Sequence, residues 1–261
     1  MTSSVLCIGV ANVDVIAHVD TGFLVLHRID KGTSTLMRAA DILALAGDLK
    51  NPISIPGGCA ANTACGVSLC GIETSFAGMI HDDFYGDIFR NGFAPYNVAF
   101  RGAINAEKST SLCLTLVTPD KDRSFVFSPD AASWFLSESD LPDLEAGRST
   151  IVYTEANLFR MTAGTTRQSM VHAVIDKYHG ADAKIMLNLI DTEITVHQRQ
   201  VIFDLILKGK LACVISNIEE LMALFSADSP EQAFESAAAL PQLADAAVYT
   251  RPAFTTNLVL A

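Results

Sequence analysis

The feature that most constrains the fold is the regular alternation of strand-like and helix-like segments in the second half of the chain. The strand-like segments are short and apolar, and the helix-like segments carry apolar residues at intervals of three and four. Strands that alternate with helices predict a parallel sheet covered on both faces. The expected strands are 150–154, 184–190, 211–215 and 246–250, and the expected helices are 166–178, 195–207, 218–225 and 230–240.

The first half predicts a smaller second sheet. Residues 5–11 are apolar and predict a buried strand, whereas residues 12–19 alternate and place Asp14 on the polar face. A strand with one wet face is typical of a cover or lid rather than of a central sheet. A hairpin over 111–118 and 123–128 is expected to join this cover. Further expected segments are strands over 31–36 and 74–80 and helices over 38–49 and 59–70. Residues 81–87 are expected to lead into another helix, which ends at about residue 91.

A glycine pair separates an apolar run from a segment of small residues with helical character. Gly57 and Gly58 allow close approach to the backbone, and the helix that follows begins with unpaired N–H groups. Asn62 adds a side-chain donor and acceptor about one turn later. The stretch alone fits two interpretations equally well: a site for a polar, multi-hydroxyl ligand, or a tight turn before a closely packed helix.

Composition excludes several classes of function. The net charge of −11 argues against a nucleic-acid partner, because phosphate binding needs basic clusters. No apolar run is long enough to span a membrane, and no basic region precedes the first apolar strand. The six cysteines contain no C-x-x-C pair and lie in apolar or small-residue surroundings. We therefore expect buried, reduced thiols in a cytoplasmic protein.

Several short motifs, taken in order, resemble the ribokinase-like (PfkB) carbohydrate and nucleoside kinases, most closely their adenosine-kinase-like branch. These motifs are Gly9-x-x-x-x-Asp14, Gly57-Gly58-x-Ala60-x-Asn62-Thr63, Val117-Thr118-Pro119-Asp120-x-x-Arg123 and Asn217-x-x-Glu220. The resemblance implies a three-layer α/β/α fold with a mostly parallel central sheet and a small β lid. It implies one domain over 1–261, with lid segments at about 13–36 and 104–128.

The resemblance implies transfer of a phosphoryl group from ATP to the hydroxymethyl group of a sugar or nucleoside, with an adenosine-like acceptor favoured. Asp14, Gly57, Gly58 and Asn62 would bind this small-molecule acceptor. Glu155 follows a predicted strand and is a further acceptor-binding candidate. The alternative for Glu155 is an exposed loop carboxylate, which the sequence slightly favours.

On the nucleotide side, the resemblance implies that Asn188, Asn217 and Glu220 contribute to binding ATP, with Mg²⁺ organised near Glu220. Asn217 and Glu220 also fit a helix N-cap followed three positions later by a capping-box glutamate. Both roles are compatible with each other, and the sequence leaves them open.

One family motif is missing. The glycine-rich G-A-G-D turn, whose aspartate is the general base, cannot be present because no glycine follows Gly209. We therefore expect a C-terminally incomplete domain and a kinase activity that is impaired or lost. The alternative is a non-catalytic ligand-binding or scaffold homologue. The exposed strand edges of the lid also predict a homodimer that forms through the lid.

Overall fold

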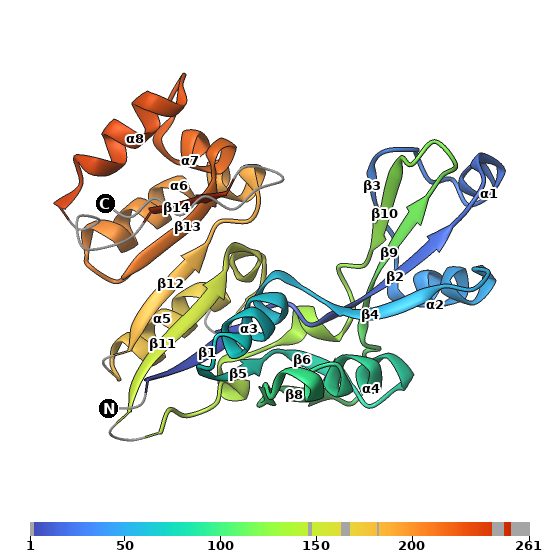
Figure 1. Ribbon diagram of the computed structural model, residues 1–261, viewed down its shortest axis with the longest axis horizontal. Helices are drawn as coiled ribbons and strands as arrows, with labels where there is room; N and C mark the ends of the chain where they lie inside the picture. The colour runs from blue at the N-terminus through green and yellow to red at the C-terminus, as the bar shows by residue number, and fades with distance from the viewer. Residues whose placement is uncertain (1–2, 146–147, 163–167, 182, 242–247, 252–261) are drawn as a thin grey trace.

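The computed structural model describes residues 3–145, 148–162, 168–181, 183–241 and 248–251. Within these residues the central sheet has seven strands in the order β14-β13-β12-β11-β1-β5-β7, and every neighbouring pair is parallel (Figure 1). The strands are β1 (Ser3–Ile8), β5 (Glu73–Ala77), β7 (Ala99–Phe100), β11 (Ser149–Glu155), β12 (Lys184–Asn188), β13 (Cys213–Asn217) and β14 (Val248–Arg251). The parallel sheet predicted from the alternating segments is confirmed.

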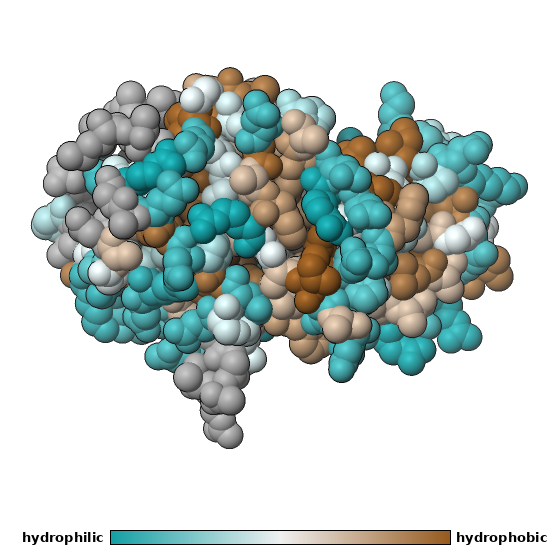
Figure 2. All heavy atoms as spheres, turned by 90° about the horizontal axis from the view of Figure 1, so that it is seen from below, coloured by the Kyte–Doolittle hydropathy of each residue, from teal (hydrophilic) through white to brown (hydrophobic). Residues whose placement is uncertain are grey.

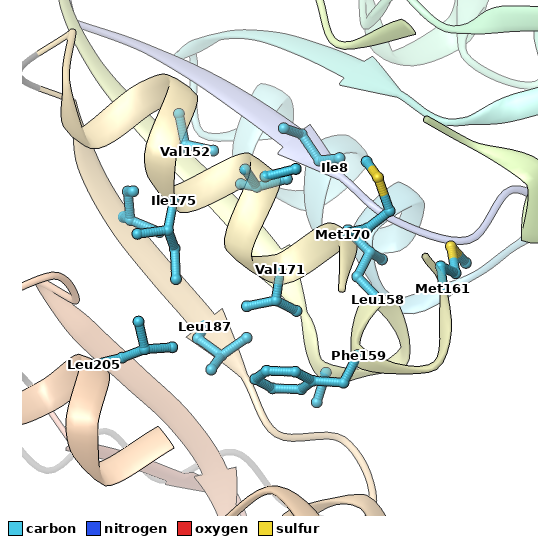
Figure 3. Close-up of a cluster of buried hydrophobic side chains, with 14 of the residues drawn as sticks. Ile8, Val152, Leu158, Phe159, Met161, Met170, Val171, Ile175, Leu187 and Leu205 are labelled. Atoms are coloured by element: carbon cyan, nitrogen blue, oxygen red, sulfur yellow. The ribbon is translucent and has the colours of Figure 1, made fainter. Parts of the chain in front are cut away.

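Alternate residues of β1 show why helices are needed on both faces of this sheet. Leu6 and Ile8 belong to one buried cluster, whereas Val5 and Cys7 belong to another. Side chains alternate along a strand, so the two clusters lie on opposite faces. Figure 3 shows the first cluster, in which residues of α5 pack against β11 and β12. The helices around the sheet are α3 (Cys59–Leu69), α4 (Phe84–Asn91), α5 (Met170–His179), α6 (Thr192–Leu207), α7 (Ile218–Phe225) and α8 (Pro230–Ala238).

The lid is a separate five-stranded sheet with the order β3-β10-β9-β2-β4. Along β2 (Asn12–His18), Val13, Val15 and Ala17 are buried, while Asp14 is half-buried on the opposite face, as the alternation predicted. The apolar face packs against α2 (Ala39–Asp48) through residues such as Ile42 and Leu45. The remaining lid elements are α1 (Thr21–Leu26), β3 (Ser34–Leu36), β4 (Ile53–Gly57), β9 (Ser111–Val117) and β10 (Arg123–Phe127). Figure 1 shows the lid standing beside the central sheet.

Three expectations about single elements need correction. The strand expected over 74–80 divides at Gly78 into β5 and β6 (Met79–His81), and β6 pairs with β8 (Ala103–Asn105) instead of the central sheet. A Cβ at Gly78 would lie 2.7 Å from the Gly9 carbonyl oxygen, so the backbone segments at Gly78 and Gly9 pass close to each other. Helix α1 was not expected, and Asp20 caps it by accepting a hydrogen bond from the Phe23 N–H. Helix α6 begins earlier than expected because Asp191 caps it.

The remaining segments are short. They include four 3-10 turns: η1 (Ala94–Tyr96), η2 (Ala132–Phe135), η3 (Glu138–Asp140) and η4 (Ala156–Arg160). Residues 166–167 of an expected helix and residues 246–247 of an expected strand lie outside the described residues. The prediction of buried thiols is confirmed for Cys7 and Cys213, while Cys65 and Cys113 are only partly buried. It is wrong for Cys59 and Cys70, which are exposed. Among the described helices, none has the length and apolar character needed to cross a membrane.

Candidate functional site

A cavity of about 490 Å³ lies between the lid and the carboxyl ends of the central strands. The chain starts in β1, moves outward to β5 and β7, and then returns to the other side of β1 to form β11. Strand order therefore reverses between β1 and β11, which is where ligands bind in open α/β sheets. Val10 follows β1 and Glu155 ends β11, and both line the cavity. A smaller cavity of about 170 Å³ lies at the opposite, amino-terminal ends of the strands.

Asp14 lines the cavity from the polar face of the lid. Asn12 Nδ2 donates a hydrogen bond to Asp14 Oδ1 at 2.7 Å and so fixes the carboxylate. Burial raises the pKa of the Asp14 carboxyl above its usual value, and the bond from Asn12 opposes this rise. In the lid register, Asp14 lies opposite Cys113 of β9, which in turn lies opposite Phe127 of β10. These three residues therefore form a row across the sheet, and all three line the cavity.

The two glycines serve different purposes. A Cβ at Gly57 would collide with the Asp14 carboxylate, so glycine is what lets β4 lie against that side chain. Gly57 is not among the described residues that line the cavity. Gly58 does line it, with a φ of 101°, and a Cβ there would collide with the Val10 carbonyl oxygen. Asn62, in the first turns of α3, also lines the cavity.

Glu155 is buried, with a relative exposure of 1%, so the alternative of an exposed loop carboxylate is wrong. Its Oε1 accepts a hydrogen bond from the Val10 N–H at 3.0 Å, and its Oε2 accepts one from the Ala60 N–H at 2.9 Å. Burial raises the pKa of Glu155 to about 7, and hydrogen bonds from Val10, Ala60 and Asn157 oppose the rise. The structure thus brings Glu155 together with Asp14, Gly58 and Asn62 around one cavity.

The residues expected on the nucleotide side lie outside this cavity lining. Asn188, at the end of β12, donates from Nδ2 to the Tyr153 hydroxyl at 2.7 Å. Asn217 and Glu220 form a capping box at the start of α7, so the capping interpretation is confirmed. Glu220 Oε2 accepts from the Asn217 N–H at 2.9 Å, and Asn217 Oδ1 accepts from the Glu220 N–H at 2.7 Å. Among the described residues, no group of three or more His, Cys, Asp or Glu side chains is arranged to hold a metal ion.

Several cavity residues were missed by the sequence reasoning. They come from turns and helix ends that carry no periodic signal, and they include Trp134 of η2, Arg160 of η4 and Asp191 at the start of α6. Two of the three carry a local sequence signal: Trp134 is the only tryptophan in the chain, and an aspartate such as Asp191 is a typical helix N-cap. Phe127 was placed correctly in a strand, but its position over the cavity depends on the register of the hairpin.

The fold and the site together define a three-layer α/β protein in which a β lid covers a cavity at the carboxyl ends of the central strands. The chain belongs to the pfkB family of carbohydrate kinases, whose family model matches residues 46–253. This finding confirms the resemblance and the fold that the sequence motifs predicted.

Solved structures support the same assignment over nearly the whole chain. An adenosine kinase from Sinorhizobium meliloti is 26% identical with a TM-score of 0.76, over 99% of this chain and 81% of that one. A probable sugar kinase from Rhizobium etli is also 26% identical with a TM-score of 0.76, over 95% of this chain and 73% of that one.

The similarity to curated relatives is more local. A fructokinase from Klebsiella pneumoniae is 32% identical over 98 residues, which are 37% of this chain and 32% of that protein. A probable fructokinase-2 from Arabidopsis thaliana is 29% identical over 131 residues, which are 49% of this chain and 40% of that protein. The chain therefore matches about a third to two fifths of the length of these relatives.

Proposed function

We propose that the chain binds a sugar or nucleoside in the lid-covered cavity and that the reaction of this site is phosphoryl transfer from ATP to a hydroxymethyl group. The observation that carries the proposal is the Asp14 carboxylate, which Asn12 holds next to Gly58 and Asn62 at the cavity. A carboxylate accepts strong, charge-assisted hydrogen bonds from neutral hydroxyl groups. In this proposal Asp14, Gly58 and Asn62 bind the acceptor directly, and Gly57 makes room for the Asp14 side chain.

The charges around the cavity favour a neutral acceptor. The described lining carries the carboxylates Asp14, Glu155 and Asp191, whereas Arg160 is its one basic residue. An acceptor that already bears a phosphate would be repelled by this excess of negative charge. We therefore propose an unphosphorylated sugar or nucleoside as the substrate.

An adenosine-like acceptor is favoured over a simple sugar. A cavity of about 490 Å³ is large enough for a nucleoside, and it is lined by the aromatic side chains of Phe127 and Trp134. A base that stacks on an aromatic ring gains about 1–3 kcal/mol, which a sugar without a base cannot gain. The similarity to the Sinorhizobium meliloti adenosine kinase supports this choice, while the fructokinase relatives support a hexose as the second candidate.

The residues at the end of β13 fit a supporting role for Mg²⁺ and ATP. Mg²⁺ usually keeps several of its waters and binds through one or two carboxylates together with substrate phosphates. The Glu220 carboxylate is already held by the Asn217 N–H and side chain, so we propose that it orients metal-bound water instead of binding the ion directly. When bound, Mg²⁺ would neutralise charge on the phosphates. Asn188 is proposed to face the nucleotide.

We propose that turnover by this chain is impaired, because residues 210–261 contain no glycine and hence no G-A-G-D turn. The alternative is a ligand-binding or scaffold homologue without chemistry. Acceptor-dependent release of ADP from ATP separates the two proposals, since a measurable rate would exclude the alternative. A cytoplasmic location stays a prediction from the sequence.

Thermal unfolding with adenosine, fructose and ribose tests the acceptor proposal. A ligand that binds only the folded state raises the melting temperature by mass action, so adenosine should give the largest increase. Asp14→Ala should weaken adenosine binding by about 1.5–3 kcal/mol, the usual cost of losing a hydrogen bond to a charged group. Asp48→Ala removes an exposed lid aspartate and serves as the control, with no change expected. Equal affinity of the Asp14→Ala variant and the unmodified chain would exclude the proposed role of Asp14.

A further inference from the structure

We infer that Glu155 is a positioning residue that joins the two halves of the acceptor site and caps helix α3 from a distant strand. The two halves are the segment after β1, which leads to Asp14, and the start of α3, which carries Asn62. We call the Glu155 carboxylate, with its hydrogen bonds to the Val10 and Ala60 N–H groups, the joint. Its importance for ligand binding rests on the proposed function, whereas the two hydrogen bonds are present in the ligand-free chain.

Helix α3 cannot be capped by its own N-cap residue. That residue is Gly58, which has a φ of 101° and no room for a side chain because a Cβ would collide with the Val10 carbonyl oxygen. The residues that normally cap helices are therefore excluded here, although the first N–H groups of any helix need partners. The Glu155 side chain supplies one, since its Oε2 accepts from the Ala60 N–H at 2.9 Å.

The other oxygen of the same carboxylate binds the opposite half of the site. Glu155 Oε1 accepts from the Val10 N–H at 3.0 Å, two residues before Asn12. Asn12 in turn holds the Asp14 carboxylate at 2.7 Å. A chain of hydrogen bonds thus runs from α3 through Glu155 to the segment that positions Asp14.

Packing around the carboxylate leaves little freedom at this joint. A Cβ at Gly9 would lie 2.6 Å from the Ala60 Cβ and 2.8 Å from the Glu155 carboxyl carbon, so the three segments meet without spare space. Among the described residues, Glu155 forms no ion pair with any lysine, arginine or histidine. The backbone N–H groups and the positive end of the α3 dipole favour its ionised form, but burial outweighs them and the pKa is raised.

In its ionised form, which predominates above about pH 7, Glu155 presents an acceptor at both side-chain oxygens. In Glu155→Gln the amide nitrogen would face one of the two N–H groups, and two donors cannot bond to each other. The substitution keeps the size of the side chain and removes one connection of the joint. A residue that only contacted the acceptor would not change the ligand-free backbone in this way.

The test is amide hydrogen exchange of the full ligand-free chain at pH 8, where Glu155 is mostly ionised, followed by adenosine titration at the same pH. In Glu155→Gln, exchange at the Val10 or Ala60 N–H should rise by about tenfold or more, and adenosine affinity should fall by a similar factor. The effects of Glu155→Gln and Asp14→Ala on affinity should be clearly non-additive, because one residue acts through the position of the other. Ile175→Val, in the core around α5, is the control for general loss of stability and should change neither quantity.

The outcomes separate the inference from the proposed function. Unchanged exchange with reduced affinity would make Glu155 a direct ligand contact and would overturn the positioning role. If neither exchange nor affinity changes, the positioning role is overturned as well. If adenosine fails to bind the unmodified chain, the proposed acceptor is wrong. The exchange result still decides whether Glu155 connects the segment after β1 to the start of α3. If Glu155→Gln does not fold, Gly9→Ala tests the same joint by pushing a methyl group into it, and unchanged exchange at Val10 and Ala60 would then contradict the inference.

Discussion

At the scale of single residues, the carboxylates of Asp14 and Glu155 both line the cavity but are held in different ways. Asp14 is bonded by the Asn12 side chain, and its carboxylate is half-buried at the cavity. Glu155 is fully buried, and two backbone N–H groups engage its two oxygens. Asp14 is therefore suited to bind hydroxyl groups of a ligand, while Glu155 is suited to hold the protein around it.

The pKa of Glu155 predicts a specific dependence of stability on pH. Its pKa in the folded chain is about 7, compared with 4.5 for an unperturbed glutamate. Between these two pH values the unfolded chain has lost the proton that the folded chain still carries. The contribution of Glu155 to the free energy of unfolding is therefore present below about pH 4.5 and is lost as the pH rises towards 7.

Thermal unfolding of the unmodified chain and of Glu155→Gln between pH 5 and pH 8 would test this dependence. The melting temperature of the unmodified chain should decrease relative to that of the variant as the pH rises to about 7, and the difference should then stay constant. Taking the difference removes the contribution of the other carboxylates. Two curves that remain parallel over the whole range would contradict the raised pKa.

The sequence predicted which residues belong to the acceptor site better than it predicted how they are held. Asp14, Gly58 and Asn62 were placed by motif and by strand ends, and all line the cavity. For Glu155 the sequence slightly favoured an exposed loop carboxylate, because a residue at a strand end has no periodic signal of burial. Its burial depends on Gly9 and Ala60, which are distant in sequence and meet it only in the folded chain.

At the scale of elements, the end of β4 should tolerate no side chain at Gly57. Gly57→Ala would push a methyl group into the Asp14 carboxylate, so we expect adenosine affinity to fall by about tenfold or more and the melting temperature to decrease. Gly66→Ala in α3 is the matched control, since nothing lies within 4 Å of its Cβ and alanine favours a helix by about 1 kcal/mol. Isothermal titration of both variants would measure the difference, and equal affinities would show that the close approach at Gly57 is unimportant.

Most elements were predictable because their patterns are local, and the exceptions have tertiary causes. The lid hairpin followed from two alternating runs around a short polar turn. The division of 74–80 into two strands did not, because it requires Gly78 to pass close to Gly9. The same apolar run that reads as one strand therefore serves two different sheets.

At the scale of the whole molecule, the lid has the features of a surface that pairs with a second copy. Strands β3 and β4 form the two edges of its sheet, and they carry exposed apolar side chains: Leu36, Ile53 and Ile55 are 63%, 62% and 43% exposed. Figure 2 shows apolar groups among hydrophilic ones on the lid side of the molecule. An apolar sheet edge that remains uncovered is a template for pairing with another strand.

We therefore predict a homodimer that forms through the lid and dissociates when the edge is charged. Light scattering after size-exclusion chromatography should give the mass of two chains. In Ile53→Lys the measured mass should fall towards that of one chain, because a lysine on an edge strand opposes pairing. Leu69→Lys is the matched control, since Leu69 is 71% exposed but lies on α3, outside the lid. A dimer that survives Ile53→Lys and dissociates with Leu69→Lys would place the interface on the helical layer. The mass of a single chain at every concentration would rule out the dimer.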